Sequence, residues 1–152
     1  MTRIPLALGS ALVLLAFASG PALADEKGQA FVTAKHLDGT VAINPKAVAS
    51  LFRGPGAGPD STLRVGLEGG GLQALEGPAA DAAWAAFHDG PGAKRFLFLD
   101  HLGGTLGIPI KSVHTLYRTG SGADAKVRIV YAGDDKTVTG DEAARVWKRL
   151  VD

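Results

Sequence analysis

Cysteine is absent from the 152 residues, and its absence excludes a disulfide framework, a lipid-attachment site and a thiol nucleophile. The fold must therefore be held by packing alone. The chain also has almost no net charge, with 16 basic and 15 acidic residues. One of the basic residues, Arg3, lies in the N-terminal segment that we expect to be removed, so the remaining chain is neutral. This balance argues against strong non-specific attraction to nucleic acid or to an anionic membrane, so no nucleic-acid partner is expected.

Long hydrophobic runs are also scarce. The apolar run from Ile4 to Phe17 is shorter than the roughly 20 residues that a membrane-spanning helix needs. It follows a positively charged start and precedes the small-residue site at residues 22–24, which is the pattern of a signal peptide. We therefore expect residues 1–24 to be a signal peptide, cleavage before Asp25, and a periplasmic or secreted protein without stable membrane insertion.

What the chain does contain is an internal repeat. Residues 36–53 align without a gap to residues 101–118, and nine of the eighteen positions are identical. The match continues through small loop deletions as far as Trp84 and Trp147. A unit of about fifty residues struggles to bury its own hydrophobic face, so the two copies are expected to pack together.

Residues 25–152 are accordingly expected to form a single domain made of repeat one, at about 30–88, and repeat two, at about 95–152. The two copies differ in charge. Residues 36–87 carry three basic and five acidic groups (3 − 5 = −2), and residues 101–152 carry eight and six (8 − 6 = +2). Opposite charges favour docking of the two halves.

Each copy is expected to begin with a β-hairpin. Asp-Gly at residues 38–39 and Gly-Gly at residues 103–104 are typical of two-residue turns that need positive φ. In the second copy the first strand, residues 96–99, is apolar on both faces, which predicts a more central strand than its counterpart in the first copy.

The rest of each copy is read from alternation and from turn residues. A short turn at Pro45 and then a strand are expected, because residues 112–118 alternate with β-branched and aromatic side chains. A glycine-turned hairpin and a closing helix follow, with a capping box from Thr139 to Glu142 in the second copy. The fold class is thus α+β, with two tandem β-β-β-β-α repeats that form one pseudo-twofold domain. Its helices should each bury an apolar stripe, and these comprise Ala80, Trp84 and Phe87, and Ala143, Trp147 and Leu150.

The order of these features resembles that of the small FlbD-type flagellar-associated proteins. The resemblance covers most of each copy, and it implies a β-rich unit closed by a short helix. In the second copy Pro109-Ile110 replaces Asn44-Pro45, and no flagellar role is carried over to this chain. The matching residues are Leu37, Asp38, Gly39, Ile43, Asn44, Pro45 and Val48.

Catalytic patterns are lacking. There is no Gly-x-Ser-x-Gly motif, and no histidine has a telling spacing to a serine of the mature chain. We therefore expect no enzyme and no cofactor. A small hydrolase with its site between the repeats is an alternative, and it would require a buried carboxylate or histidine in that cleft.

Two histidines occupy equivalent positions before the hairpin turns. If the copies are related by a twofold, His36 and His101 could meet as metal ligands, which gives a metal-binding periplasmic protein as a second alternative. No His-x-His or His-x-x-x-His spacing supports this reading, so local hydrogen bonding of each histidine is favoured.

Six basic residues are the same in both copies, although many other surface positions differ. Their stems can cover a sheet while their charges pair with local carboxylates, or they can form two equivalent sites for an anionic partner. We expect an exported, non-catalytic binding or assembly module of the cell envelope, whose partner is an unknown envelope protein or an anionic glycan. The candidate binding residues are Lys46, Arg53, Arg64, Lys111, Arg118 and Arg128.

Overall fold

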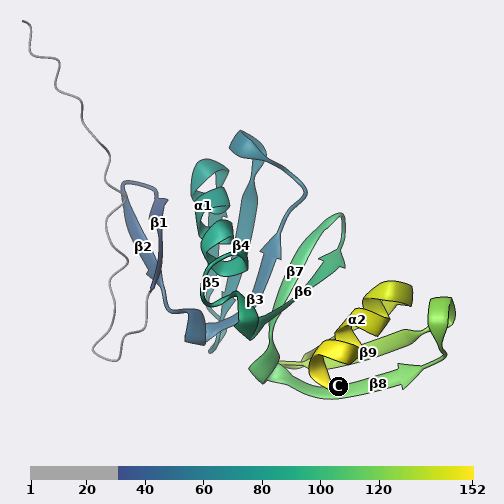
Figure 1. Cartoon of the computed structure of the whole chain (residues 1–152). Helices are drawn as coiled ribbons and strands as arrows, with labels where there is room; N and C mark the ends of the chain where they lie inside the picture. Colours follow the sequence, from purple (N-terminus) through teal and green to yellow (C-terminus); the bar gives the residue numbers. More distant parts are fainter. Residues whose placement is uncertain (1–30) are drawn as a thin grey trace, which may run out of the picture.

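The structure is a computed structural model that describes residues 31–152, so the predicted signal peptide lies outside the described residues. Five strands and a helix follow one another twice along this part of the chain (Figure 1). The first half comprises β1 (Val32–His36), β2 (Gly39–Ile43), β3 (Val48–Arg53), β4 (Thr62–Leu67), β5 (Leu72–Glu76) and α1 (Gly77–His88). The second comprises β6 (Phe96–His101), β7 (Gly104–Pro109), β8 (Val113–Thr119), β9 (Lys126–Tyr131), β10 (Asp134–Thr139) and α2 (Gly140–Leu150).

The fold is therefore mixed α+β, as the sequence predicts, but each half has five strands before its helix instead of four. The predicted segments themselves, a hairpin, the strand after the proline turn and a glycine-turned hairpin, already add to five strands, so the four-strand formula counted one too few. Short 3-10 turns join the strands. They are η1 (Pro45–Ala47), η2 (Gly58–Asp60), η3 (Ala93–Arg95), η4 (Ile110–Ser112) and η5 (Gly122–Asp124).

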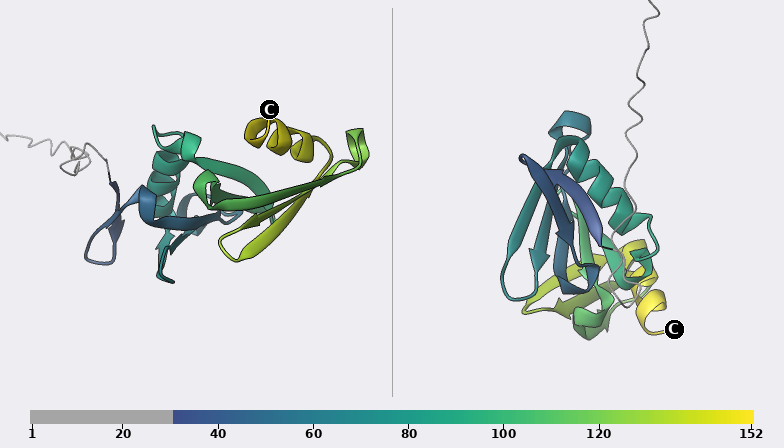
Figure 2. Two further views of the ribbon diagram at one scale, coloured as in Figure 1. Left: turned by 90° about the horizontal axis from the view of Figure 1, so that it is seen from below. Right: turned by 90° about the vertical axis from the view of Figure 1, so that its left-hand side faces the viewer.

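The strands form three antiparallel sheets, and the middle one contains strands from both halves. Its order is β5-β4-β3-β7-β6, so the first hairpin of the second half extends the sheet of the first half. The other two sheets are β1-β2 and β10-β9-β8. Figure 2 shows the β1-β2 hairpin at one end of the molecule and the β8-β9-β10 sheet at the other.

The β6-β7 hairpin is buried on both faces because it belongs to two hydrophobic cores. Phe96 packs with β3, β4 and α1 in the first core, whereas Leu97, Leu99 and Ile108 pack with β9 and α2 in the second. The sequence correctly indicates a strand with two apolar faces, but β6 lies at the edge of the sheet and not at its centre. A strand can be buried on both faces and still be an edge strand when two layers cover it.

The second half lends a hairpin to the sheet of the first half, but the first half does not lend one in return. A twofold arrangement would pair β2 with β8 just as β7 pairs with β3, but within residues 31–152 β2 pairs with β1 alone. The physical reason lies in the outer faces of the two hairpins. Phe96 and Phe98 give β6 an apolar outer face, whereas Thr33 and Lys35 of β1 are exposed.

The hairpin turns lie one residue earlier than predicted. The closing pairs are His36↔Gly39 and His101↔Gly104, so the turns are residues 37–38 and 102–103. Leu37 and Leu102 themselves adopt positive φ, at 51° and 50°. The alternation that directs the apolar side chains of each hairpin to one core sets this register, and it overrides the local preference for glycine in the turn.

The proline turn is confirmed, but the helix start is not as predicted. Pro45 begins η1, and the side chain of Asn44 accepts a hydrogen bond from the backbone N–H of Lys46 before β3 begins. The Thr139 side chain makes no capping hydrogen bond. Glu142 instead accepts the backbone N–H of Asp100 at 3.0 Å, and this bond ties α2 to β6.

The two tryptophans lie at the margins of the cores and not inside them. Both are only partly buried, whereas Ala80, Ala83 and Phe87 are the buried side chains of α1. Trp84 stacks on His88, with ring centroids 5.1 Å apart, and meets the edge of Phe98. The buried stripe of each helix is therefore made mainly of small residues, which lets the helix approach its sheet closely.

The shared hairpin depends on a glycine. A Cβ at Gly107 would lie 3.0 Å from Leu51 Cβ and 3.1 Å from Phe98 Cε1. We expect Gly107→Ala to lower the free energy of unfolding by about 1–3 kcal/mol, the usual cost of overpacking. Gly92→Ala is the matched control, because a Cβ there meets nothing within 4 Å and φ is −81°. Chemical denaturation of both variants measures the difference, and equal stabilities would show that the hairpin tolerates the extra methyl.

Candidate nucleic-acid interface

Three 3-10 turns come together at one end of the five-stranded sheet. Because neighbouring strands are antiparallel, the start of β3, the end of β7 and the start of β6 lie at the same end. The turns η1, η3 and η4 adjoin these strand ends, which places them beside one another at the boundary of the two halves (Figure 1). This junction is where segments from both halves meet.

A groove of about 480 Å³ lies at this junction, and we call it the junction groove. Four cationic residues from the three turns line it, and its other lining residues are apolar or proline. The full lining is Pro45, Lys46, Lys94, Arg95, Phe96, Pro109, Ile110 and Lys111. Arg149 of α2 borders it, since its guanidinium donates to the carbonyls of Phe96, at 2.8 Å, and Lys94, at 3.4 Å.

Acidic groups are few at this groove. Glu68 pairs with Lys111, with Oε1 2.7 Å from Nζ, and both side chains are more than half exposed. Lys111 Nζ also donates to the backbone carbonyl of Lys46. Lys46, Lys94 and Arg95 take part in none of the ion pairs of residues 31–152. The junction groove therefore concentrates positive charge that the whole-chain balance hides.

The structure thus brings together one of the three predicted basic pairs, Lys46 and Lys111. Sequence reasoning missed Lys94, Arg95 and Arg149, which complete the cluster. The Lys-Arg pair directly after the glycine-rich hinge at residues 90–92 was the available signal. Its importance depends on the antiparallel pairing of β6 with β7, which the repeat alone does not specify.

The second pair, Arg53 and Arg118, has diverged in its surroundings. The Arg53 side chain is 13% exposed, and Nη2 lies 2.6 Å from Asp81 Oδ1 and 2.9 Å from Ser61 Oγ. Its other nitrogen donates to backbone carbonyls, including that of Gly56 at 3.0 Å. Arg53 thereby joins β3 and α1 to the loop between β3 and β4.

Arg118 has no such network. The positions that correspond to Ser61 and Asp81 are Ala125 and Ala144, which offer no side-chain acceptor. Its guanidinium carbon instead lies 5.4 Å from the centre of the Trp147 ring, in a cation–π contact.

The third pair, Arg64 and Arg128, lies on the sheet faces turned away from the helices. Arg128 donates to both carboxylate oxygens of Asp135, at 3.0 and 3.2 Å. This hydrogen bond, together with the charge of the guanidinium, holds the pKa of Asp135 below its usual value and raises the pKa of Arg128. Burial is the main cause that raises the pKa of Tyr131, and the charges of Asp134 and Asp135 add to it.

The histidines do not meet. His36 Nε2 lies 3.3 Å from Gln73 Nε2 on β5, and His101 Nδ1 lies 3.1 Å from Lys136 Nζ. Because β5 and β6 are opposite edges of a five-stranded sheet, these sites are roughly 19 Å apart at the usual strand spacing of about 4.8 Å. The metal site of paired histidines is therefore wrong, and no group of three or more potential ligands gathers anywhere in residues 31–152.

The hydrolase alternative also finds no matching arrangement. The junction groove is lined by no carboxylate or histidine. A second hollow of about 390 Å³ holds Ser50, His101 and Asp134, but His101 is directed to Lys136. No hydrogen bond between Ser50 and His101 occurs in the described part of the chain, so the contact between nucleophile and base that such a mechanism uses is not formed.

Comparison with known proteins gives a fold likeness. No protein-family model and no curated protein matches the chain. Among solved structures it is similar to the LytTr DNA-binding domain assigned to a methyl-accepting/DNA response regulator from Bacillus cereus, with 15% identity and a TM-score of 0.52. The match covers 82% of this chain and 100% of that one.

This likeness corrects several expectations. The exported envelope module and the periplasmic or secreted location are contradicted, because the similar structure is a DNA-binding domain of a response regulator. The exclusion of nucleic acid as a partner is contradicted on the same ground. That expectation rested on net charge, which averages over the whole surface and does not exclude a local cluster of cations.

A separate observation concerns the helices. In the part of the chain that the structure describes, neither helix is long and apolar enough to cross a membrane.

Arg53 and Arg64, each of which recurs in the second copy, should respond differently to replacement. Arg53→Gln removes a partly buried ionic network and should lower the free energy of unfolding by about 1.5–3 kcal/mol, the range for hydrogen bonds to charged groups. Arg64→Gln, an exposed arginine on the next strand, should change it by less than about 0.5 kcal/mol. Thermal or urea unfolding measures both, and a similar small effect at the two positions would show that Arg53 is not a structural link.

Acidification should report on the Arg128 pair. Because the pKa of Asp135 is lowered in the folded state, the pair stabilises the fold above the ordinary carboxylate pKa and loses this effect as pH falls through the lowered value. Arg128→Gln should return the pKa of Asp135 toward its usual value, which NMR titration of the carboxyl measures. The pKa of Tyr131 should stay raised, because burial is its main cause. An unchanged pKa of Asp135 would contradict the pairing.

Proposed function

We propose that this chain is a DNA-binding domain that holds the phosphate backbone of duplex DNA at the junction groove. The observation that carries the proposal is the gathering of five cationic side chains from η1, η3, η4 and α2 around one groove. Phosphate contacts supply essentially all of the sequence-independent affinity of proteins for duplex DNA, and lysine and arginine are their main source of charge.

The groove has the features that such contacts need. Lys46, Lys94 and Arg95 have no carboxylate partner among the ion pairs of the described chain, so their charge is available to a phosphate. Arg149 is held in place by two backbone carbonyls, which fixes one guanidinium before any ligand arrives. Apolar walls at Phe96 and Ile110 exclude water beside the charges and strengthen their field.

The fold likeness supports the same proposal. At 15% identity it concerns the fold alone, but it gives a DNA-binding domain as one protein built on this arrangement of strands and helices. We further propose that the two halves are tandem copies joined head to tail, and that the chain contributes binding and no catalytic step. The FlbD-type resemblance stays a prediction that concerns the single repeat.

Salt dependence provides the test. With a short duplex of generic sequence, the logarithm of the binding constant should fall linearly with the logarithm of salt concentration, by about 0.9 for each phosphate contacted. The double variant Lys94→Gln/Arg95→Gln removes two groove cations, so the slope should decrease in magnitude by about 2. Fluorescence anisotropy over a salt series measures both slopes.

The matched control removes two exposed lysines that lie elsewhere, in Lys35→Gln/Lys126→Gln. Its slope should stay close to that of the native chain, although its net charge changes equally. If the control loses as much as the groove variant, binding follows net charge and the groove is not the site. If the native chain does not bind duplex DNA at all, the proposed function is wrong.

A further inference from the structure

The β8 edge of the second half is the counterpart of an edge that is covered in the first half. β3 pairs with β4 on one side and with β7 on the other, whereas within residues 31–152 β8 pairs only with β9. By the same alignment, β2 is the counterpart of β7, and its outer edge pairs with nothing in the described chain. The molecule thus has two open strand edges that correspond to the paired strands β3 and β7. We call the β8 edge the acceptor edge and the β2 edge the donor edge.

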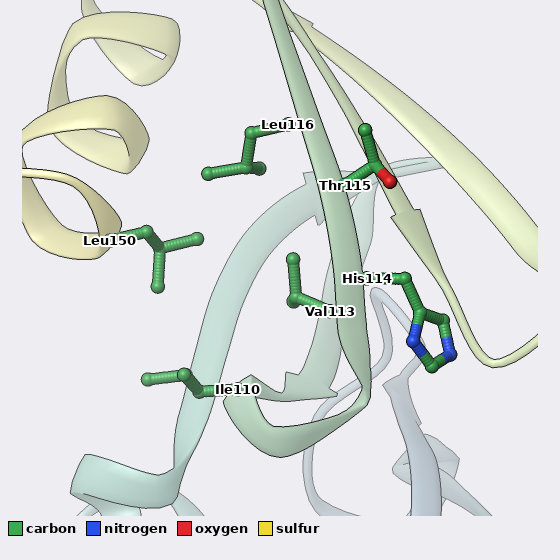
Figure 3. A pocket seen from close by; sticks show the side chains of 6 residues that line it. All are labelled: Ile110, Val113, His114, Thr115, Leu116 and Leu150. Carbon is green, nitrogen blue, oxygen red and sulfur yellow. The ribbon is translucent and has the colours of Figure 1, made fainter.

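An apolar slot accompanies the open edge. Figure 3 shows Ile110, Val113, Leu116 and Leu150 directed into the space between β8 and α2, with His114 pointing away from it. The counterparts of the last three in the first half are Val48, Leu51 and Phe87, which are at most 1% exposed. Phe96 of the incoming β6 fills that space, and its ring lies 5.9 Å from Phe87. In the second half the same positions are only partly buried.

We propose that the β1-β2 hairpin of a second copy of this chain docks on the β8 edge, with β2 pairing antiparallel to β8. The register follows from the internal contact, where Leu51↔Gly107, Phe52↔Leu106 and Arg53↔Thr105 are paired. Shifting each residue to its counterpart gives Leu116 opposite Ala42, Tyr117 opposite Val41, and Arg118 opposite Thr40. An extended edge strand that receives a further strand in this way is a recurrent mode of association.

The side chains of the donor hairpin fit this placement. Phe31 is the counterpart of Phe96 and would enter the slot. Ala42 replaces Gly107, whose hydrogen leaves room for the Phe98 ring, but Thr33 stands in place of Phe98 and leaves space for the extra methyl. The exposed Tyr117 corresponds to Phe52, whose ring meets His101 edge-on at 5.8 Å, and it would meet His36 of the second copy.

Charge and geometry both favour a second copy over another occupant. The first half, which carries the donor hairpin with Lys35, has a charge of −1 over residues 31–88 (4 − 5), and the acceptor half has +1 over residues 96–152 (8 − 7). Donor and acceptor lie at opposite ends of the molecule, so one copy cannot satisfy both of its own edges (Figure 2). The contact is heterologous and leads from dimers to chains of molecules. The outer face of β1 carries Thr33 and Lys35 where β6 has Phe98 and Asp100, so it offers less apolar surface and the association is weaker than the internal contact.

Disulfide trapping tests the register, because the chain has no cysteine of its own. Thr40→Cys protein mixed with Arg118→Cys protein under mild oxidation should give a mixed dimer in excess, since paired antiparallel residues have the Cα separation that a disulfide needs. Thr40→Cys mixed with Thr137→Cys, on the far edge strand β10, is the matched control. A yield of mixed dimer no higher than the control overturns the proposed pairing.

Sedimentation of the full chain tests the association itself. The apparent mass should rise with protein concentration for the native chain and for Ala74→Asp, an exposed alanine on β5, but not for Ala42→Asp. Circular dichroism confirms that both variants fold. A native chain that keeps the mass of one molecule at every concentration overturns the proposal. Equal association of the two variants does so as well.

Discussion

The pairing of β7 with β3 is the contact on which the rest of the structure depends. It places one hairpin between two cores, so that Phe96 belongs to the first and Leu97 to the second. Neither half has a complete sheet without it, since β3 would lose a neighbour and the second core would lose one wall. Packing of this kind joins the two halves through a shared hairpin, without the disulfides that a chain lacking cysteine cannot form.

The sequence predicts the units well and their assembly poorly. The repeat, the proline turn before β3 and the two apolar faces of β6 are all visible in residue patterns, because each depends on local spacing. The hairpin register was missed by one residue because the alternation toward the core outweighs the glycine preference of the turn. The direction of exchange between the halves could not be read, since both hairpins carry the same turn motif and only the outer faces differ.

The candidate site shows the same division. The search for residues that are identical in both copies identifies Lys46 and Lys111, which do come together. It also selects Arg53, which instead forms an ion pair with Asp81 inside the first half. The copies share the arginine at positions 53 and 118, but the second lacks the serine and aspartate that give the first its role. Lys94 and Arg95 have no counterparts in the repeat, so a comparison of copies is blind to them. Their place at the groove arises from the long-range pairing of β6 and β7.

The junction groove and the two open edges are related by the same geometry. Internally, η1 precedes β3 and η4 follows β7, so the pairing of these strands brings Lys46 beside Lys111. Pairing of β2 with β8 between copies would bring η1 of one molecule beside η4 of the other, and would again place these two lysines at one junction. A head-to-tail assembly would therefore repeat positive charge along one side at each junction. Such a strip follows a phosphate backbone more readily than an isolated groove does, since each added contact releases further counterions.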